Sequence, residues 1–347
     1  MNPTQNQYPE RRDSAAEGTV AADSGQIKAE LDAARSGTIF ADLSHFGLIR
    51  FAGEDAQQFL NGQLSCDVNS LEPLHARYGS YSTPKGRMLA TVLLWRDAAG
   101  FFMQLPRSLR EPIQKRLSMY ILRSKVKAED ASGAHVLIGV AGKDAGAILK
   151  PLFAALPAEP LTLTSPEGTS LLRLSADRYQ IIASPERASA LRDAIARNAA
   201  PVGPAVWDWF DIRAGIPFIT PATQEQLVPQ MANLDLIGGV SFSKGCYPGQ
   251  EIVARMHYLG RLKQRMYLAN IQGAEPPQPG DKLYSAAMDD QASGMIVSAA
   301  PSPDGGSDVL AAVQIESAKG DAVHWKSPDG PQLRFLELPY RLSSPER

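Results

Sequence analysis

The chain has 347 residues, of which 44% are hydrophobic and 21% charged, and its formal net charge is -2. These values are ordinary for a soluble globular protein and allow two or three domains of roughly 100–200 residues each. The charge gives no basic field that would point to direct nucleic-acid binding. No apolar run approaches the roughly 18 residues of a membrane-spanning helix, and the N-terminus lacks the features of a signal or transit peptide. We therefore expect a cytoplasmic protein that binds neither membrane nor nucleic acid directly.

The two cysteines, Cys66 and Cys246, are too few for a disulfide framework and indicate a reducing compartment. They form no metal-ligand spacing, and neither do the five histidines. A single copy of this chain, with two cysteines, cannot supply four cysteine ligands to an iron–sulfur cluster. We therefore expect no stably bound metal, and we expect Cys66 to be a small buried core residue.

Three globular parts are expected after a disordered tail at 1–25, which is rich in Asn, Gln, Ser, Ala and Gly. A short helix at 27–35 precedes the first α+β domain, at 38–130. Its predicted elements are a strand at 47–53, a helix at 54–61, a three-stranded meander at 77–82, 87–95 and 101–105, a helix at 106–122 and a strand at 124–128.

The second α+β domain is expected at 134–260 and the last part at 261–347. The second domain is predicted to contain strands at 135–140, 171–174 and 178–182 and helices at 144–156, 185–199 and 204–216. The last part has six short strands separated by turn signals, at 264–269, 282–285, 294–299, 309–315, 323–326 and 333–337. Such a pattern is typical of a small antiparallel β-barrel.

The stretch Lys244 to Glu251 carries the densest chemistry in the chain, with a thiol, a cation, a carboxylate and two glycines in eight residues. Pro248 excludes a regular helix through Cys246, so the thiol is expected on a stiff loop. A cation such as Lys244 or Arg255 favours the thiolate, the nucleophilic form. The residues alone leave two interpretations, a reactive or ligand-contacting cysteine and a buried, inert one in a tight turn.

The pattern Lys-Gly-Cys-Tyr-x-Gly-Gln-Glu, followed by Ile-Val-Ala-Arg and Tyr258-Leu259-Gly260-Arg261, resembles the signature of the YgfZ family. These folate-binding proteins are related to the T-protein (aminomethyltransferase) of the glycine cleavage system. The resemblance extends from about Thr38 to the C-terminal end. It implies an α+β fold, with a T-protein-like folate-binding body of antiparallel sheets and helices plus a small C-terminal antiparallel β-barrel.

The resemblance also implies tetrahydrofolate or a derivative as ligand and a role in iron–sulfur cluster assembly or repair. Through client enzymes, that role would extend to tRNA modification. Cys246 is then the functional thiol, with Lys244 to aid it. The remaining members of the motif complete or orient the loop: Gly245, Tyr247, Gly249, Gln250, Glu251 and Arg255.

Three further positions correspond to folate contacts in the family. Trp207 matches a folate-contacting Trp, and Phe46 stands where the family can carry another; each has the alternative of a plain core residue. Arg213 stands where the T-protein pattern has a Glu that can accept hydrogen bonds from the pterin. Because an Arg has only donors, either another acid reads the pterin, or folate sits differently, or Arg213 pairs with an acid such as Asp211.

The turn Lys85-Gly86-Arg87 occupies the place where aminomethyltransferases carry their catalytic Asp, and the stretch Arg87 to Ala90 contains no carboxylate. This argues against glycine cleavage and leaves enzymatic activity uncertain, with the balance against it. The favoured hypothesis is a folate-binding accessory protein whose partners are folate and iron–sulfur client or assembly proteins. The alternatives are a folate-dependent one-carbon (aminomethyl) transferase and a protein scaffold that does not bind folate.

Overall fold

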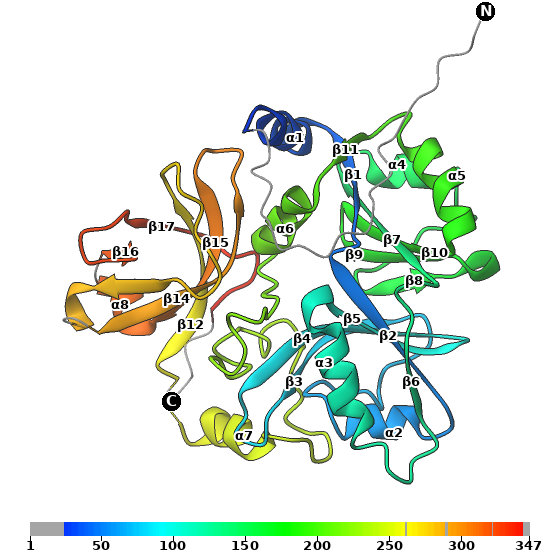
Figure 1. Cartoon of the computed structure of the whole chain (residues 1–347), viewed down its shortest axis with the longest axis horizontal. Helices are drawn as coiled ribbons and strands as arrows, with labels where there is room; N and C mark the ends of the chain where they lie inside the picture. The colour runs from blue at the N-terminus through cyan, green and yellow to red at the C-terminus, as the bar shows by residue number, and fades with distance from the viewer. Residues whose placement is uncertain (1–23, 261, 289–290, 321, 343–347) are drawn as a thin grey trace, which may run out of the picture.

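The computed structural model describes residues 24–260, 262–288, 291–320 and 322–342. The predicted tail at 1–25 falls almost entirely outside these residues, as does Arg261. The described residues form three sheets around a central helix, α6 (Pro204–Arg213), as Figure 1 shows. No helix among them is long and apolar enough to cross a membrane.

The first sheet is antiparallel, with strand order β3-β4-β5-β2-β6. It contains the predicted meander, and α3 packs on it through Leu109, Ile113 and Leu117. Helix α7 follows the cysteine-containing loop described below, which packs against the turn between β3 and β4. The bounds are β2 (Phe46–Ala52), α2 (Ala56–Asn61), β3 (Ala76–Ser82), β4 (Met88–Asp97), β5 (Gly100–Pro106), α3 (Arg107–Ser118), β6 (Lys127–Asp130) and α7 (Gln250–Tyr258).

The second sheet has the order β11-β1-β7-β10-β9-β8, and only its β1–β11 pair is parallel. Helices α4 and α5 cover one face, and an apolar layer joins the other face to the first sheet. The bounds are α1 (Ser24–Ser36), β1 (Thr38–Asp42), β7 (Val136–Gly142), α4 (Ala145–Leu149), β8 (Thr162–Thr164), the 3-10 helix η1 (Pro166–Gly168), β9 (Ser170–Ser175), β10 (Arg178–Ala183), α5 (Pro185–Ile195) and β11 (Ala200–Val202).

The third sheet is antiparallel, with the order β16-β13-β14-β15-β12-β17. Its two end strands approach each other through the isolated bridge between His324 and Gln332, so the sheet curls as the predicted small barrel does. The bounds are β12 (Gln264–Ile271), β13 (Lys282–Ser285), η2 (Ala286–Met288), β14 (Ala292–Pro301), β15 (Ser307–Gln314), α8 (Ile315–Gly320), β16 (Val323–Trp325) and β17 (Leu333–Leu336).

The predicted fold class is confirmed, and several element bounds need correction. Helix α4 stops at Leu149 instead of 156, because Pro151 disfavours a helical conformation at Lys150 and cannot donate to the helix. Three short strands (β1, β8 and β11) and helix α8 were not predicted from the sequence. Strand β1 precedes the first sheet in the chain but pairs with β7 of the second, so the first two sheets are interleaved in sequence.

Candidate functional site

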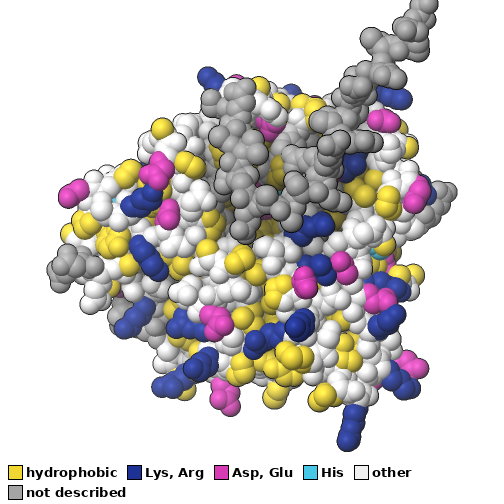
Figure 2. Space-filling model, viewed as in Figure 1, with side chains coloured by type: hydrophobic (Ala, Val, Ile, Leu, Met, Phe, Trp, Pro, Cys, Tyr) yellow, Lys and Arg dark blue, Asp and Glu magenta, His cyan; other side chains and the backbone are white. Residues whose placement is uncertain are grey.

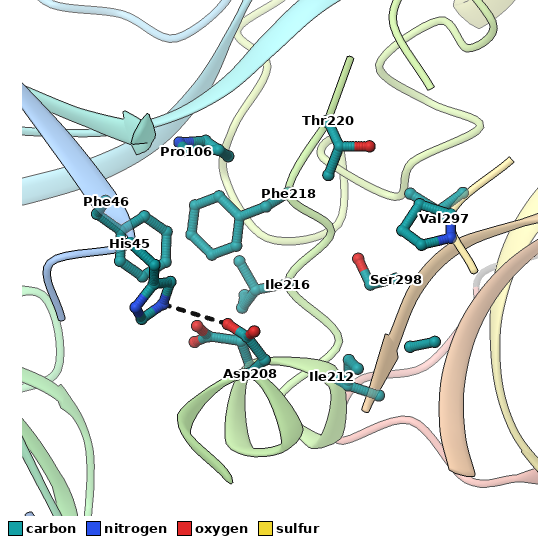
Figure 3. A pocket seen from close by; sticks show the side chains of 13 residues that line it. His45, Phe46, Pro106, Asp208, Ile212, Ile216, Phe218, Thr220, Val297 and Ser298 are labelled. Carbon is teal, nitrogen blue, oxygen red and sulfur yellow. Dashed lines mark ion pairs between the residues drawn. The ribbon is translucent and has the colours of Figure 1, made fainter. Parts of the chain in front are cut away.

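A cavity of about 170 Å³ lies between the first and third sheets beside α6, and we call it the central cavity. Figure 3 shows its side chains converging from β2, α6, the segment after α6 and β14. Its lining residues are His45, Phe46, Pro106, Asp208, Asp211, Ile212, Ile216, Phe218, Thr220, Pro279, Val297, Ser298 and Ala299.

An aromatic pair forms one wall of the central cavity. Phe46 starts β2 and is 4% exposed, and its ring centroid lies 4.9 Å from that of Phe218. The structure therefore places Phe46 both in the core and at the wall of the cavity. Phe218 was missed, and only its position just after the Ala-Gly-Ile-Pro segment could have suggested it.

Two acids and a histidine form the polar side of the cavity. Nε2 of His45 lies 3.3 Å from Oδ1 of Asp208, as Figure 3 shows, but neither ring nitrogen of His45 is aligned for a hydrogen bond with a described residue. Asp211 is buried, and Nη2 of Arg178 lies 2.5 Å from its Oδ1. Burial raises the pKa of Asp211, while the Arg178 guanidinium acts in the opposite direction. Sequence reasoning missed His45 and Asp208 as a pair.

Trp207 and Arg213 do not line the central cavity. Trp207 is 1% exposed, and its ring lies over Gly139, where an added Cβ would come within 2.3 Å of the indole. The guanidinium of Arg178 lies 4.7 Å from the ring centroid of Trp207. Arg213 is on another side of α6, with Nη1 3.8 Å from a carboxylate oxygen of Asp308. The structure thus supports the core alternative for Trp207 and an ion pair for Arg213, with Asp308 in place of Asp211.

The cysteine loop, residues 244–249, holds Cys246 exposed at the surface. Gly249 has φ +84°, and a Cβ there would lie 2.5 Å from Cα of Gly86 and 2.6 Å from the carbonyl oxygen of Thr83. The loop is therefore seated directly on the turn that joins β3 to β4. Cys66, by contrast, is buried as predicted, and burial raises the pKa of its thiol to about 11.

Lys244 reaches away from the exposed thiol and into the protein. Its Nζ donates hydrogen bonds to the carbonyl oxygens of Asn61, Leu64 (2.7 Å) and Cys66 (3.1 Å). Burial lowers the pKa of Lys244 to about 8, which still leaves it mostly charged at neutral pH. The sequence predicted that Lys244 aids the Cys246 thiolate, and the structure instead gives it an anchoring role. Its ammonium is directed at three carbonyl oxygens, one at the end of α2 and two just after it.

The rest of the motif divides between buried supports and exposed side chains. Tyr247 is buried, its hydroxyl has no hydrogen-bond partner among the described residues, and its ring centroid lies 5.0 Å from Nζ of Lys244. Gln250 is the first residue of α7, and Glu251 and Arg255 are exposed on that helix. Gly245 has open space around it. None of residues 244–251 lines the central cavity, so the structure contains two separate candidate sites.

No group of three or more His, Cys, Asp or Glu side chains is arranged to hold a metal ion in the part of the chain that the structure describes. The two candidate sites offer two kinds of chemistry. The central cavity can bind a flat ring and accept hydrogen bonds from it, and the cysteine loop can present one thiol to another molecule.

The fold defines the class of the protein. Its structure is similar to a crystal structure of the glycine cleavage system aminomethyltransferase T from Bartonella henselae, with a TM-score of 0.75 and 20% identity over 90% of this chain and 89% of that one. The profile of the GCVT N-terminal domain family matches residues 4–165. The chain therefore has a T-protein-like fold.

The sequence comparison names the family. The chain is 32% identical over 302 residues to proteins named tRNA-modifying protein YgfZ from Klebsiella pneumoniae (strain 342) and Escherichia coli (strain SMS-3-5 / SECEC). In both cases the match covers 86% of this chain and 92% of the relative. This chain belongs to the YgfZ family, as the motif at 244–251 predicted.

Proposed function

We propose that the protein binds a tetrahydrofolate-type ligand in the central cavity and supports iron–sulfur proteins, and through them tRNA modification, with Cys246 as its functional thiol. The ligand part is supported by the T-protein-like fold and by a cavity with an aromatic wall and a polar side. Apolar lining with a few placed polar groups is the usual composition of a small-molecule site.

The size of the cavity limits which part of a folate it takes. A cavity of about 150 Å³ suffices for one benzene-sized ring. At about 170 Å³, the central cavity suits one ring of the fused ring system of the ligand, with the second ring and the aminobenzoyl-glutamate tail left outside. Phe46 and Phe218 would pack against the ring faces.

Calorimetric titration with tetrahydrofolate under anaerobic, reducing conditions tests this binding. We expect micromolar affinity, about −8 kcal/mol. The variant Phe218→Leu keeps an apolar side chain but removes the flat ring, so we expect affinity to fall about three- to tenfold. Phe335→Leu, on the third sheet and outside the cavity lining, is the matched control and should bind as the wild type does. The absence of saturable binding to the wild-type protein would remove the folate part of the proposal.

The observation that carries the thiol part is that Cys246 is exposed on a loop fixed at both ends. Lys244 anchors one end and Gly249 the other, so the loop holds the thiol at the surface without burying it. Beside it, α7 and its C-terminal end expose Ile252, Tyr258 and Leu259. Figure 2 shows apolar, basic and acidic side chains mixed on the part of this face where Figure 1 places α7 and the β3–β4 hairpin. Exposed apolar groups on the helix that follows the thiol-bearing loop suit contact with a partner protein.

We expect Cys246→Ala to leave the fold intact but to fail to restore iron–sulfur enzyme activity in cells lacking the native gene. The thiol is exposed, so its removal opens no cavity and should change the free energy of unfolding by less than about 0.5 kcal/mol. Ser243→Ala, an exposed neighbour in the sequence, is the matched control and should restore activity. Full rescue by Cys246→Ala would remove the central role of the thiol.

A folate-dependent one-carbon transferase remains the second candidate, because the fold is that of an aminomethyltransferase. Against it, Lys85 is exposed, Arg87 donates to the carbonyl oxygen of Gln226 at 2.8 Å, and the turn supports the cysteine loop instead of the central cavity. Turnover of tetrahydrofolate with an aminomethyl donor would promote this candidate. A scaffold without folate is the remaining alternative, and the titration above decides it.

A further inference from the structure

The polar groups around the central cavity include an acid, Asp208, whose carboxylate keeps room for a further hydrogen-bond donor. Asp211 is held by Arg178, whereas the Asp208 side chain is 46% exposed and has only His45 as an ion-pair partner among the described residues. Both ring nitrogens of His45 are buried without an aligned hydrogen bond. A buried polar group without a partner is costly, so this side of the cavity is suited to a polar ligand. Because the Asp208 carboxylate can only accept, that ligand should bring hydrogen-bond donors to it.

The geometry of α6 explains why Asp208 and not position 213 faces the cavity. At about 100° per residue, positions 208, 211 and 212 fall on one stripe of the helix, and all three line the cavity. Position 213 is about 140° around the helix from Asp208, and its Arg is directed to Asp308. In this chain a side chain at 213 is therefore placed outside the cavity, whatever its chemistry.

We propose that Asp208, whose Oδ1 lies 3.3 Å from Nε2 of His45, is the specificity-determining residue of the central cavity and accepts the paired N–H donors at the edge of a 2-aminopyrimidinone ring. This inference rests on the proposed function and deepens it. A carboxylate accepts two parallel N–H groups well, as it does with a guanidinium. In tetrahydrofolate these donors are the ring N3–H and the 2-amino group. Asp208 thus supplies the acceptor that Arg213 cannot.

The test pairs a change in the protein with a change in the ligand. Wild type and Asp208→Asn are titrated with tetrahydrofolate and with its 2-desamino analogue, which lacks one donor. We expect the wild type to bind the analogue about 10- to 100-fold more weakly, because a hydrogen bond to a charged acceptor is lost. Asp208→Asn should bind tetrahydrofolate about 10- to 100-fold more weakly and should discriminate between the two ligands less than threefold.

The control variant is Arg213→Gln, which should retain the full discrimination of the wild type because its side chain lies outside the cavity. Asp208→Asn is nearly isosteric and partly exposed, and an unchanged thermal midpoint shows that it folds. If the wild type binds tetrahydrofolate but Asp208→Asn keeps the discrimination, the role of Asp208 is refuted while folate binding stands. If the wild type binds neither ligand, the proposed function fails and the inference falls with it.

Discussion

Replacing Lys244 with methionine is expected to lower the free energy of unfolding by about 3–5 kcal/mol. Methionine preserves most of the apolar length of the side chain but removes the ammonium that donates to the carbonyl oxygens of Asn61, Leu64 and Cys66. Three carbonyls at the end of α2 and just after it then lose a charged donor in a half-buried setting, where water replaces it incompletely. Urea unfolding followed by tryptophan fluorescence measures the loss.

The matched control is Lys85→Met, in the turn against which the cysteine loop packs. Lys85 is exposed, so its replacement is expected to change the free energy of unfolding by no more than about 0.5 kcal/mol. Comparing the stability of the two variants therefore separates the anchoring role of Lys244 from a general effect of positive charge near the loop. If Lys244→Met were as stable as the wild type and only slowed alkylation of Cys246, Lys244 would act on the thiol and the anchoring role would be wrong.

Lys244 also shows how far the sequence could be read. The motif at 244–251 correctly predicted a loop, because Pro248 excludes a regular helix there, and it also predicted the family. The distance along the chain placed a cation two residues from Cys246, but it carried no information on where the side chain points. That direction is set by Asn61, Leu64 and Cys66, about 180 residues earlier in the chain. A contact of such sequence separation is fixed by tertiary packing, which local patterns do not contain.

The central cavity was harder to predict than the cysteine loop for a related reason. Its walls come from β2, from α6 and the segment after it, and from β14, which lie in different sheets or between them. Phe46 was found because the residues around it resemble the family. Trp207 was proposed on the same ground, yet it packs over Gly139 in the layer between two sheets. Trp207 and Asp208 are adjacent in α6, and only their different directions around the helix axis place Asp208 at the cavity and Trp207 in the core.

The two candidate sites are supported by different physical means. The shape of the central cavity depends on which side chains α6 directs into it and on packing between sheets. Substituting a single exposed lining residue should therefore change ligand binding more than the free energy of unfolding. The cysteine loop depends on the close backbone contact of Gly249 with Gly86 and on the half-buried ammonium of Lys244. Substitutions of these two supports therefore change stability before they change chemistry. Loss of function at Lys244 or Gly249 must therefore be compared with stability before it is assigned to chemistry, whereas loss at Cys246 needs no such correction.

Gly249→Ala is expected to destabilise the protein by about 3 kcal/mol or to lift the cysteine loop from its seat. Gly249 has φ +84°, a left-handed conformation that costs a residue with a Cβ about 1–2 kcal/mol. The added Cβ would also lie 2.5 Å from Cα and 2.6 Å from N of Gly86, and these are backbone atoms that cannot rotate away. Overpacking of this kind adds about 1–3 kcal/mol.

Gly245→Ala is the matched control within the same motif. Gly245 has no atom within 4 Å of an added Cβ and no left-handed φ, so its substitution should change the free energy of unfolding by less than about 0.5 kcal/mol. Urea unfolding of both variants gives the comparison, and limited proteolysis reports whether the chain between 244 and 249 has become accessible. Equal stability of the two variants would show that the loop is not seated on the β3–β4 turn. A large loss for Gly249→Ala alone would establish this seat as the support that keeps Cys246 at the surface.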